Sequence, residues 1–147
     1  MTNTSDSNLS PGGWVEFQDY DSWIYSDDGS IQEGDAVSMW EHVVFDAARR
    51  INKEPAPGPS LEKWVRDQGF INIQHRVFKI PSNSWPKDPK LKMIGAYMLD
   101  NLFQGLEGFN MRLLCGALGW TEQEVTVLLA GVKRQLYSTE CHGYWNW

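Results

Sequence analysis

The sequence lacks any long hydrophobic run, and it also lacks an excess of basic residues. Its 147 residues include 13 Lys and Arg against 19 Asp and Glu, which gives a formal net charge of −6. No apolar stretch approaches the ~20 residues that a membrane-spanning helix needs. The polar N-terminus has neither the basic nor the apolar region of a signal peptide. We therefore expect a cytoplasmic protein that binds neither nucleic acid nor a membrane.

Cysteine and histidine are scarce as well. The two cysteines, Cys115 and Cys141, have no metal-type spacing, and the three histidines are not clustered with other ligands. No Gly-x-Ser-x-Gly motif, phosphate-binding loop or paired-carboxylate signature is present. We therefore expect no bound metal, and no such motif identifies a reaction.

Tryptophan, by contrast, is abundant. The eight tryptophans are spread along the chain without a period. Because large aromatic side chains bury much apolar area, we expect some in the core and others lining a pocket or an interface. The length fits a single domain over residues 11–147, preceded by a mobile Ser-, Thr- and Asn-rich segment over residues 1–10.

Two segments have the composition of buried strands. Pro11-Gly12-Gly13 makes a turn before an aromatic and β-branched run over residues 14–20, and a second such run spans residues 70–79. The last four residues, 144–147, form either a short strand or a loose tail. A strand that lacks neighbours exposes its backbone edge, so we expect a homodimer or docking on a partner chain.

Helical periodicity covers most of the remaining chain. Apolar spacing predicts a helix over residues 34–52 and a second over residues 61–68, which Ser60 caps and Gly69 ends. It also predicts a long helical stretch from Lys90 that breaks near Gly105 and Gly108. Thr121 and Glu124 form a capping box for the last helix. The pattern therefore predicts a helix-rich α/β or α+β fold with two or three strands.

Several short motifs together resemble one known family. They are Pro11-Gly12-Gly13-Trp14-Val15-Glu16, Asp27-Asp28-Gly29-Ser30, Trp85-Pro86-Lys87-Asp88, Gly119-Trp120-Thr121 and His142-Gly143-Tyr144-Trp145. In this order they resemble fungal class I methyltransferases related to the secondary-metabolism regulator LaeA. The resemblance covers nearly the whole chain.

The resemblance implies a remnant of a Rossmann-like fold. In the family, the Pro-Gly-Gly turn precedes the fifth strand of a seven-stranded sheet, and S-adenosylmethionine binds to the first four strands through a Gly-rich turn. No segment here matches that turn, and the family continues past its His-x-Tyr segment into a last strand. We therefore expect the C-terminal half of such an enzyme without the cofactor-binding half, and no bound cofactor.

The candidate catalytic residues are His142, Tyr144 and Asp19. A histidine and a tyrosine two residues apart can orient or protonate a carbonyl group, and the resemblance places His142 and Tyr144 near the substrate. Asp19 lies at the end of the first predicted strand, where ligands gather in open α/β sheets. The alternatives are an ordinary tail segment for the first two residues and a turn carboxylate for Asp19.

The candidate substrate-binding residues are Tyr20, Trp23, His75, Tyr97 and Asn101. Tyr20 and Trp23 follow the first predicted strand, and alternation in the second strand directs His75 inward. Tyr97 and Asn101 share one helix face in a region that lines the substrate side in methyltransferases. Each of these residues is also compatible with an ordinary core or surface position.

Four functions remain open at this point. One is a cofactor-independent cyclase or isomerase that holds a small apolar natural product in an aromatic-lined pocket. The alternative is a methyltransferase of fungal secondary metabolism that uses S-adenosylmethionine. A third is a non-catalytic accessory subunit of a full-length methyltransferase, and a fourth is an inactive gene product.

Overall fold

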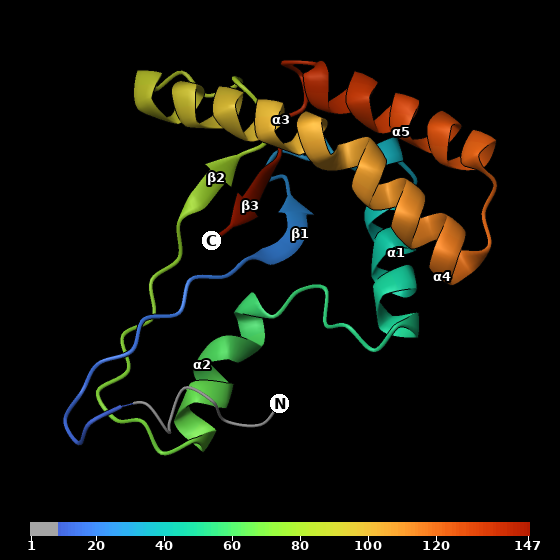
Figure 1. The fold of residues 1–147 in the computed structure, drawn as a ribbon. Helices are drawn as coiled ribbons and strands as arrows, with labels where there is room; N and C mark the ends of the chain where they lie inside the picture. The colour runs from blue at the N-terminus through green and yellow to red at the C-terminus, as the bar shows by residue number, and fades with distance from the viewer. Residues whose placement is uncertain (1–8) are drawn as a thin grey trace.

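A computed structural model describes residues 9–147 of the chain (Figure 1). Except for Leu9 and Ser10, the segment predicted to be mobile lies outside the described residues. The elements in chain order are β1 (Asp21–Tyr25), α1 (Ala36–Arg50), α2 (Gly58–Asp67), β2 (Lys79–Pro81), α3 (Pro89–Asn110), the π-helical turn η2 (Met111–Cys115), α4 (Gly116–Leu118), α5 (Glu122–Tyr137) and β3 (Tyr144–Asn146). The predicted class is confirmed, because this part of the chain is rich in helix and has three short strands.

The sheet has the strand order β1–β3–β2, and both pairs are antiparallel. The last strand, β3, is therefore central. Tyr144 lies opposite Tyr25 on one side and opposite Pro81 on the other. The chain end is thus a strand rather than a loose tail.

The predicted strands are wrong in their bounds. Residues 14–20 belong to no strand, and within the second predicted run the strand β2 begins only at Lys79, next to the backbone pairing of Phe78 with Trp147. Composition favours extended backbone, but a strand also needs a neighbour to satisfy its N–H and C=O groups. Within residues 9–147 no strand lies beside residues 14–20, so they remain extended and unpaired.

The helices follow the predictions more closely. Helix α1 lies within the predicted range, and the Thr121–Glu124 capping box is present at α5. Helix α2 begins at Gly58 rather than after a Ser60 cap, because Pro59 pre-sets the first turn. Gly58 also lets α2 approach the chain before β1, with its N–H donating to the Tyr20 carbonyl at 2.9 Å.

The predicted break at Gly105 and Gly108 is wrong. Helix α3 runs through both glycines, and the irregular turn η2 follows at residue 111. Asn110, fully buried at this junction, accepts a hydrogen bond from the Trp40 indole at 2.8 Å and donates to the Leu106 carbonyl at 2.6 Å. The hydrogen bond between Trp40 of α1 and Asn110 therefore lies beside η2, whereas Gly105 and Gly108 face open space.

One apolar core joins α1, α3, η2 and α5. Its buried side chains include Val37, Val44, Leu106, Leu114, Val125, Leu129, Val132 and Leu136. In Figure 1, α3 and α5 lie next to each other above α1, the sheet is beside them, and α2 stands apart from the other helices. This packing holds β3 and the loop between β1 and α1 in place, and the polar residues of interest lie there.

Candidate functional site

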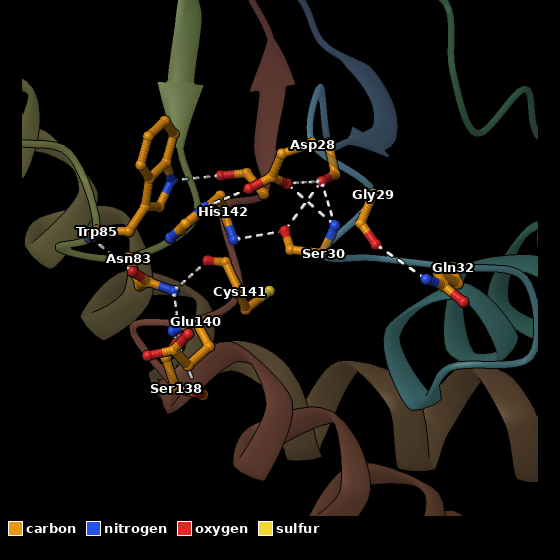
Figure 2. Close-up of polar contacts among 12 residues, drawn as sticks. Asp28, Gly29, Ser30, Gln32, Asn83, Trp85, Ser138, Glu140, Cys141 and His142 are labelled. Atoms are coloured by element: carbon orange, nitrogen blue, oxygen red, sulfur yellow. Dashed lines mark hydrogen bonds and ion pairs between the residues drawn. The ribbon is translucent and has the colours of Figure 1, made fainter.

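His142 and Asp28 form a histidine–carboxylate pair at the start of β3. The His142 Nδ1 atom lies 2.5 Å from Asp28 Oδ2, and the backbone N–H of His142 donates to Ser30 Oγ at 2.8 Å (Figure 2). The imidazole also lies against the Trp85 indole, with ring centroids 5.1 Å apart. The ring is therefore held by a carboxylate on one edge and by an aromatic face.

The turn before α1 keeps Asp28 ionised. Ser26 Oγ donates to Asp28 Oδ1 at 2.8 Å, and the Ser30 N–H donates to the same oxygen at 3.0 Å. Hydrogen bonds from His142 first, and then from these serines, hold the pKa of the Asp28 carboxyl far below its ordinary value. Because an ionised carboxylate only accepts, Nδ1 of His142 carries the proton. Nε2 of the neutral ring is then left as an acceptor.

Tyr144 and Lys79 meet the neighbouring carboxylate, Asp27. The Tyr144 hydroxyl donates to Asp27 Oδ1 at 2.6 Å, and Lys79 Nζ lies 2.8 Å from Asp27 Oδ2. The same ammonium group lies 4.0 Å from the centre of the Tyr144 ring. The bond from Lys79, followed by that from Tyr144, lowers the pKa of Asp27. Asp27 thus binds Lys79 of β2 and Tyr144 of β3, while the adjacent Asp28 binds His142, which precedes β3.

A buried asparagine holds the segment that carries His142. Asn83 Nδ2 donates to the carbonyls of Leu136, Ser138 and Cys141 at 2.9, 3.1 and 3.0 Å (Figure 2). The Trp85 indole N–H and the Ser82 backbone N–H both donate to the Gly143 carbonyl at 2.9 Å. The loop after β2 therefore fixes both sides of residue 142.

A buried carboxyl group lies behind the sheet. Glu41 of α1 accepts the Ile24 N–H at 2.6 Å and is only 4 % exposed. Burial, which exceeds every other effect here, raises the pKa of Glu41 to about 8. On β1, the Tyr25 hydroxyl donates to the buried carboxylate of Asp21, and burial raises the pKa of Tyr25 to about 12. This part of the molecule therefore holds ionisable groups in an apolar setting.

The structure places the other candidate residues elsewhere. Asp19 is exposed and accepts the adjacent Tyr20 N–H at 2.8 Å. The Tyr20 ring packs edge-on against Trp147, and Trp23 packs on Phe45. These contacts are with core or chain-end side chains rather than with the His142 pair.

His75, Tyr97 and Asn101 face solvent. The inward direction predicted for His75 is wrong, because residues 70–78 form no strand and Nδ1 of His75 instead lies 3.2 Å from a Glu62 carboxylate oxygen. Tyr97 is 70 % exposed, and Asn101 lies on the same outer face of α3. A role for these residues in binding stays a prediction.

Sequence reasoning missed the partners of His142 and Tyr144. Asp27 and Asp28 read as turn residues, and nothing in their spacing places them opposite residues more than a hundred positions away. The signal that could have found these partners is the set of short motifs that the chain shares with the family. Three of them, containing Asp28, Trp85 and His142, converge at this site.

The described part of the chain has two open cavities of interest. One, of about 670 Å³, lies between β2, the start of α3 and Trp147. The other, of about 320 Å³, lies between α1 and the chain after α4, where it is lined by His42, Asp46 and Trp120 among others. His142 and Tyr144 line neither, so the histidine pair lies on an open surface.

The described residues do not fit S-adenosylmethionine. The turn from β1 into α1 contains Gly29 and two carboxylates, but Asp27 and Asp28 are already engaged by Lys79, Tyr144 and His142. Neither cavity joins a glycine turn to a free carboxylate, which the ribose and sulfonium groups need. Over residues 9–147 there is also no cluster of three potential metal ligands, and no helix has the length and hydropathy to cross a bilayer.

Comparison with known proteins identifies relatives of the chain. Methyltransferase pytC of Aspergillus terreus is 39 % identical over 140 residues, and the probable methyltransferase tdiE of Emericella nidulans is 36 % identical over 140 residues. The secondary metabolism regulator LAE1 of Cochliobolus heterostrophus is 30 % identical over 142 residues. Each alignment covers 95 % of this chain but only 43, 44 and 46 % of the respective relative. No family model and no solved structure matches.

These similarities define the class, a helix-rich α/β part of a methyltransferase fold. More narrowly, the chain is homologous to a portion of fungal methyltransferases such as pytC and tdiE and of the LaeA-like secondary metabolism regulators. The chain spans less than half the length of these relatives. The family resemblance noted in the sequence is thereby confirmed.

Proposed function

We propose that the chain acts in fungal secondary metabolism as a cofactor-independent isomerase or cyclase. The observation that supports this is the His142–Asp28 pair, in which an ionised carboxylate fixes the imidazole tautomer and leaves Nε2 as a base. Nε2 removes a proton from a carbon beside a carbonyl group and returns it at another position. The product then has the same composition as the substrate, and no donor group is consumed.

The neighbouring cation supports the same chemistry. Lys79 and the Tyr144 hydroxyl lie next to the pair, and an ammonium group stabilises the negative charge that develops on a carbonyl oxygen. Asp28 is then a positioning residue, and His142 is the catalytic one. The substrate in this proposal is a small natural product with an apolar body.

The test starts from a strain that lacks the gene. The compound that accumulates is purified and incubated with the protein, with and without S-adenosylmethionine. An isomer of unchanged mass, formed without the methyl donor, supports the proposal. His142→Gln is expected to slow its formation by about 10²–10⁴-fold, while the matched change His42→Gln, on the exposed side of α1, leaves the rate unchanged. A rate unaltered by His142→Gln would remove His142 from the mechanism.

One observation favours a second candidate, an accessory subunit. Residues 14–20, which lead into the edge strand β1, belong to no strand, and Trp14 is 79 % and Phe17 42 % exposed. Such a segment suits addition of a strand to another chain, either a second copy or a full-length methyltransferase. A methylated product that forms only when such a partner and S-adenosylmethionine are both present would establish this function instead.

A further inference from the structure

An open groove lies at the edge of the sheet, away from the His142 ring. Its volume is about 670 Å³, which is within the range of small-molecule sites, roughly 300–1,000 Å³. The lining residues are Val77, Phe78, Lys79, Ile80, Lys90, Leu91, Ile94 and Trp147. In Figure 1 the first half of α3 extends past β2, and the groove lies where these two elements meet the chain end.

The lining is mostly apolar and partly exposed. Val77 and Phe78 are each 56 % exposed, and Leu91 is 39 % exposed. Phe78 is fixed by two backbone hydrogen bonds with Trp147, of 2.8 and 2.9 Å, so this side of the groove is ordered. Apolar side chains held in a preformed concave surface gain free energy when an apolar ligand displaces water from them.

The rim of the groove carries an unpaired positive charge. Lys90 lines the groove at the start of α3, and within residues 9–147 its ammonium group has no hydrogen-bond or ion-pair partner, whereas Lys79, which also lines it, is paired with Asp27. The nearby acid, Asp88, caps the Leu91 N–H at 2.9 Å. Helix N-termini favour acidic side chains, yet the first turn of α3 has none. The Lys90 ammonium is therefore opposed by the positive end of the helix dipole, and a bound anion relieves that repulsion.

Charge complementarity therefore selects the ligand class. The chain as a whole has a formal net charge of −6, so this basic rim is a local exception. Lys79 adds a link to the proposed catalytic residues, because it lines the groove and its ammonium contacts Asp27 and the Tyr144 ring.

We propose that this groove binds an elongated apolar molecule that has one terminal anionic group. The apolar body lies on Phe78, Leu91 and Trp147, and the anion lies near Lys90. This inference rests on the proposed function, because it identifies the bound molecule as the substrate of the proposed isomerase or cyclase, an apolar acid. Binding itself does not require proton transfer.

The experiment compares three probes with the same tail, decanoate, decanol and decylammonium, by calorimetry and by amide chemical-shift mapping of the full chain. Decanoate is expected to bind most tightly, with shifts at residues 77–80, 90–94 and 147. Lys90→Gln is expected to weaken decanoate binding about threefold, and added salt to weaken it further. The matched control is Lys53→Gln, in an exposed loop, which leaves the affinity unchanged.

Other outcomes overturn the inference. Equal affinity for decanol and decanoate would remove the anion from the ligand class. Shifts centred on the cleft beside His42, or the absence of binding at millimolar decanoate, would remove the groove as the site. His142→Gln is included because it separates the two proposals. If this variant binds decanoate as the wild type does but no longer forms the isomer, both proposals are supported. If the wild type binds decanoate but forms no isomer of any substrate, the proposed function alone is contradicted.

Discussion

The buried carboxyl of Glu41 makes the stability of this protein depend on pH. In the folded protein its pKa is raised to about 8, because burial disfavours the ionised form, whereas in the unfolded chain it is near 4.5. Between these values the folded state holds a proton that the unfolded state has lost. The contribution of Glu41 to the free energy of unfolding therefore falls as the pH rises from about 4.5 to about 8, and is level on either side.

The magnitude follows from the two pKa values. Each tenfold change in proton affinity corresponds to about 1.4 kcal/mol, so the full effect reaches at most about 5 kcal/mol. Rearrangement of the site and entry of water reduce it, and we expect about 2–3 kcal/mol. Glu41→Gln retains an oxygen for the Ile24 N–H and cannot ionise. The variant is therefore expected to be more stable than the wild type at pH 8.5 and to have nearly equal stability at pH 5.

Urea unfolding followed by tryptophan fluorescence at pH 5, 6.5 and 8.5 measures this difference. All other ionisable groups are the same in both proteins, so their contribution cancels in the comparison. Glu33→Gln, in an exposed loop, is the control and is expected to follow the wild type at every pH. If the curves for Glu41→Gln and the wild type run parallel across the whole range, the carboxyl is not titrating in the folded core and the reasoning is wrong.

Two further changes test the packing that holds the site. A Cβ at Gly95 would lie 1.9 Å from the backbone oxygen of Asn83, so Gly95→Ala is expected to lower thermal stability by more than about 3 kcal/mol or to prevent folding. Gly105→Ala in the same helix meets nothing within 4 Å and is expected to stabilise by about 0.5–1 kcal/mol. A similar result for both glycines would contradict the close approach of α3 to the loop. Asn83→Ala removes a donor from the carbonyls of Leu136, Ser138 and Cys141, and because the contacts to Leu136 and Cys141 are buried it is expected to destabilise by about 2–4 kcal/mol in thermal unfolding. Exposed Asn101→Ala should change stability by less than about 0.5 kcal/mol, and an equally small effect at Asn83 would mean that this amide does not hold the segment.

Local signals were sufficient for some elements. The apolar spacing of α1 and the Thr121–Glu124 capping box act within a few residues of themselves, so they could be read directly. The strand run at residues 14–20 has the same kind of local signal, yet it is unpaired, because backbone pairing depends on a neighbour that local composition does not supply. The apparent break at Gly105 was likewise overridden by the packing around Asn110.

The sequence by itself determined the family, the helix-rich class and the nomination of His142 and Tyr144. These depend on composition, on short motifs and on periodicity, all of which are properties of neighbouring residues. Only the tertiary structure decided that Asp28 holds the imidazole, that Asp27 joins Tyr144 to Lys79, and that Glu41 is buried. Each of these contacts joins residues from different elements, and hydrogen bonding and burial depend on distances in space, which spacing along the chain does not encode.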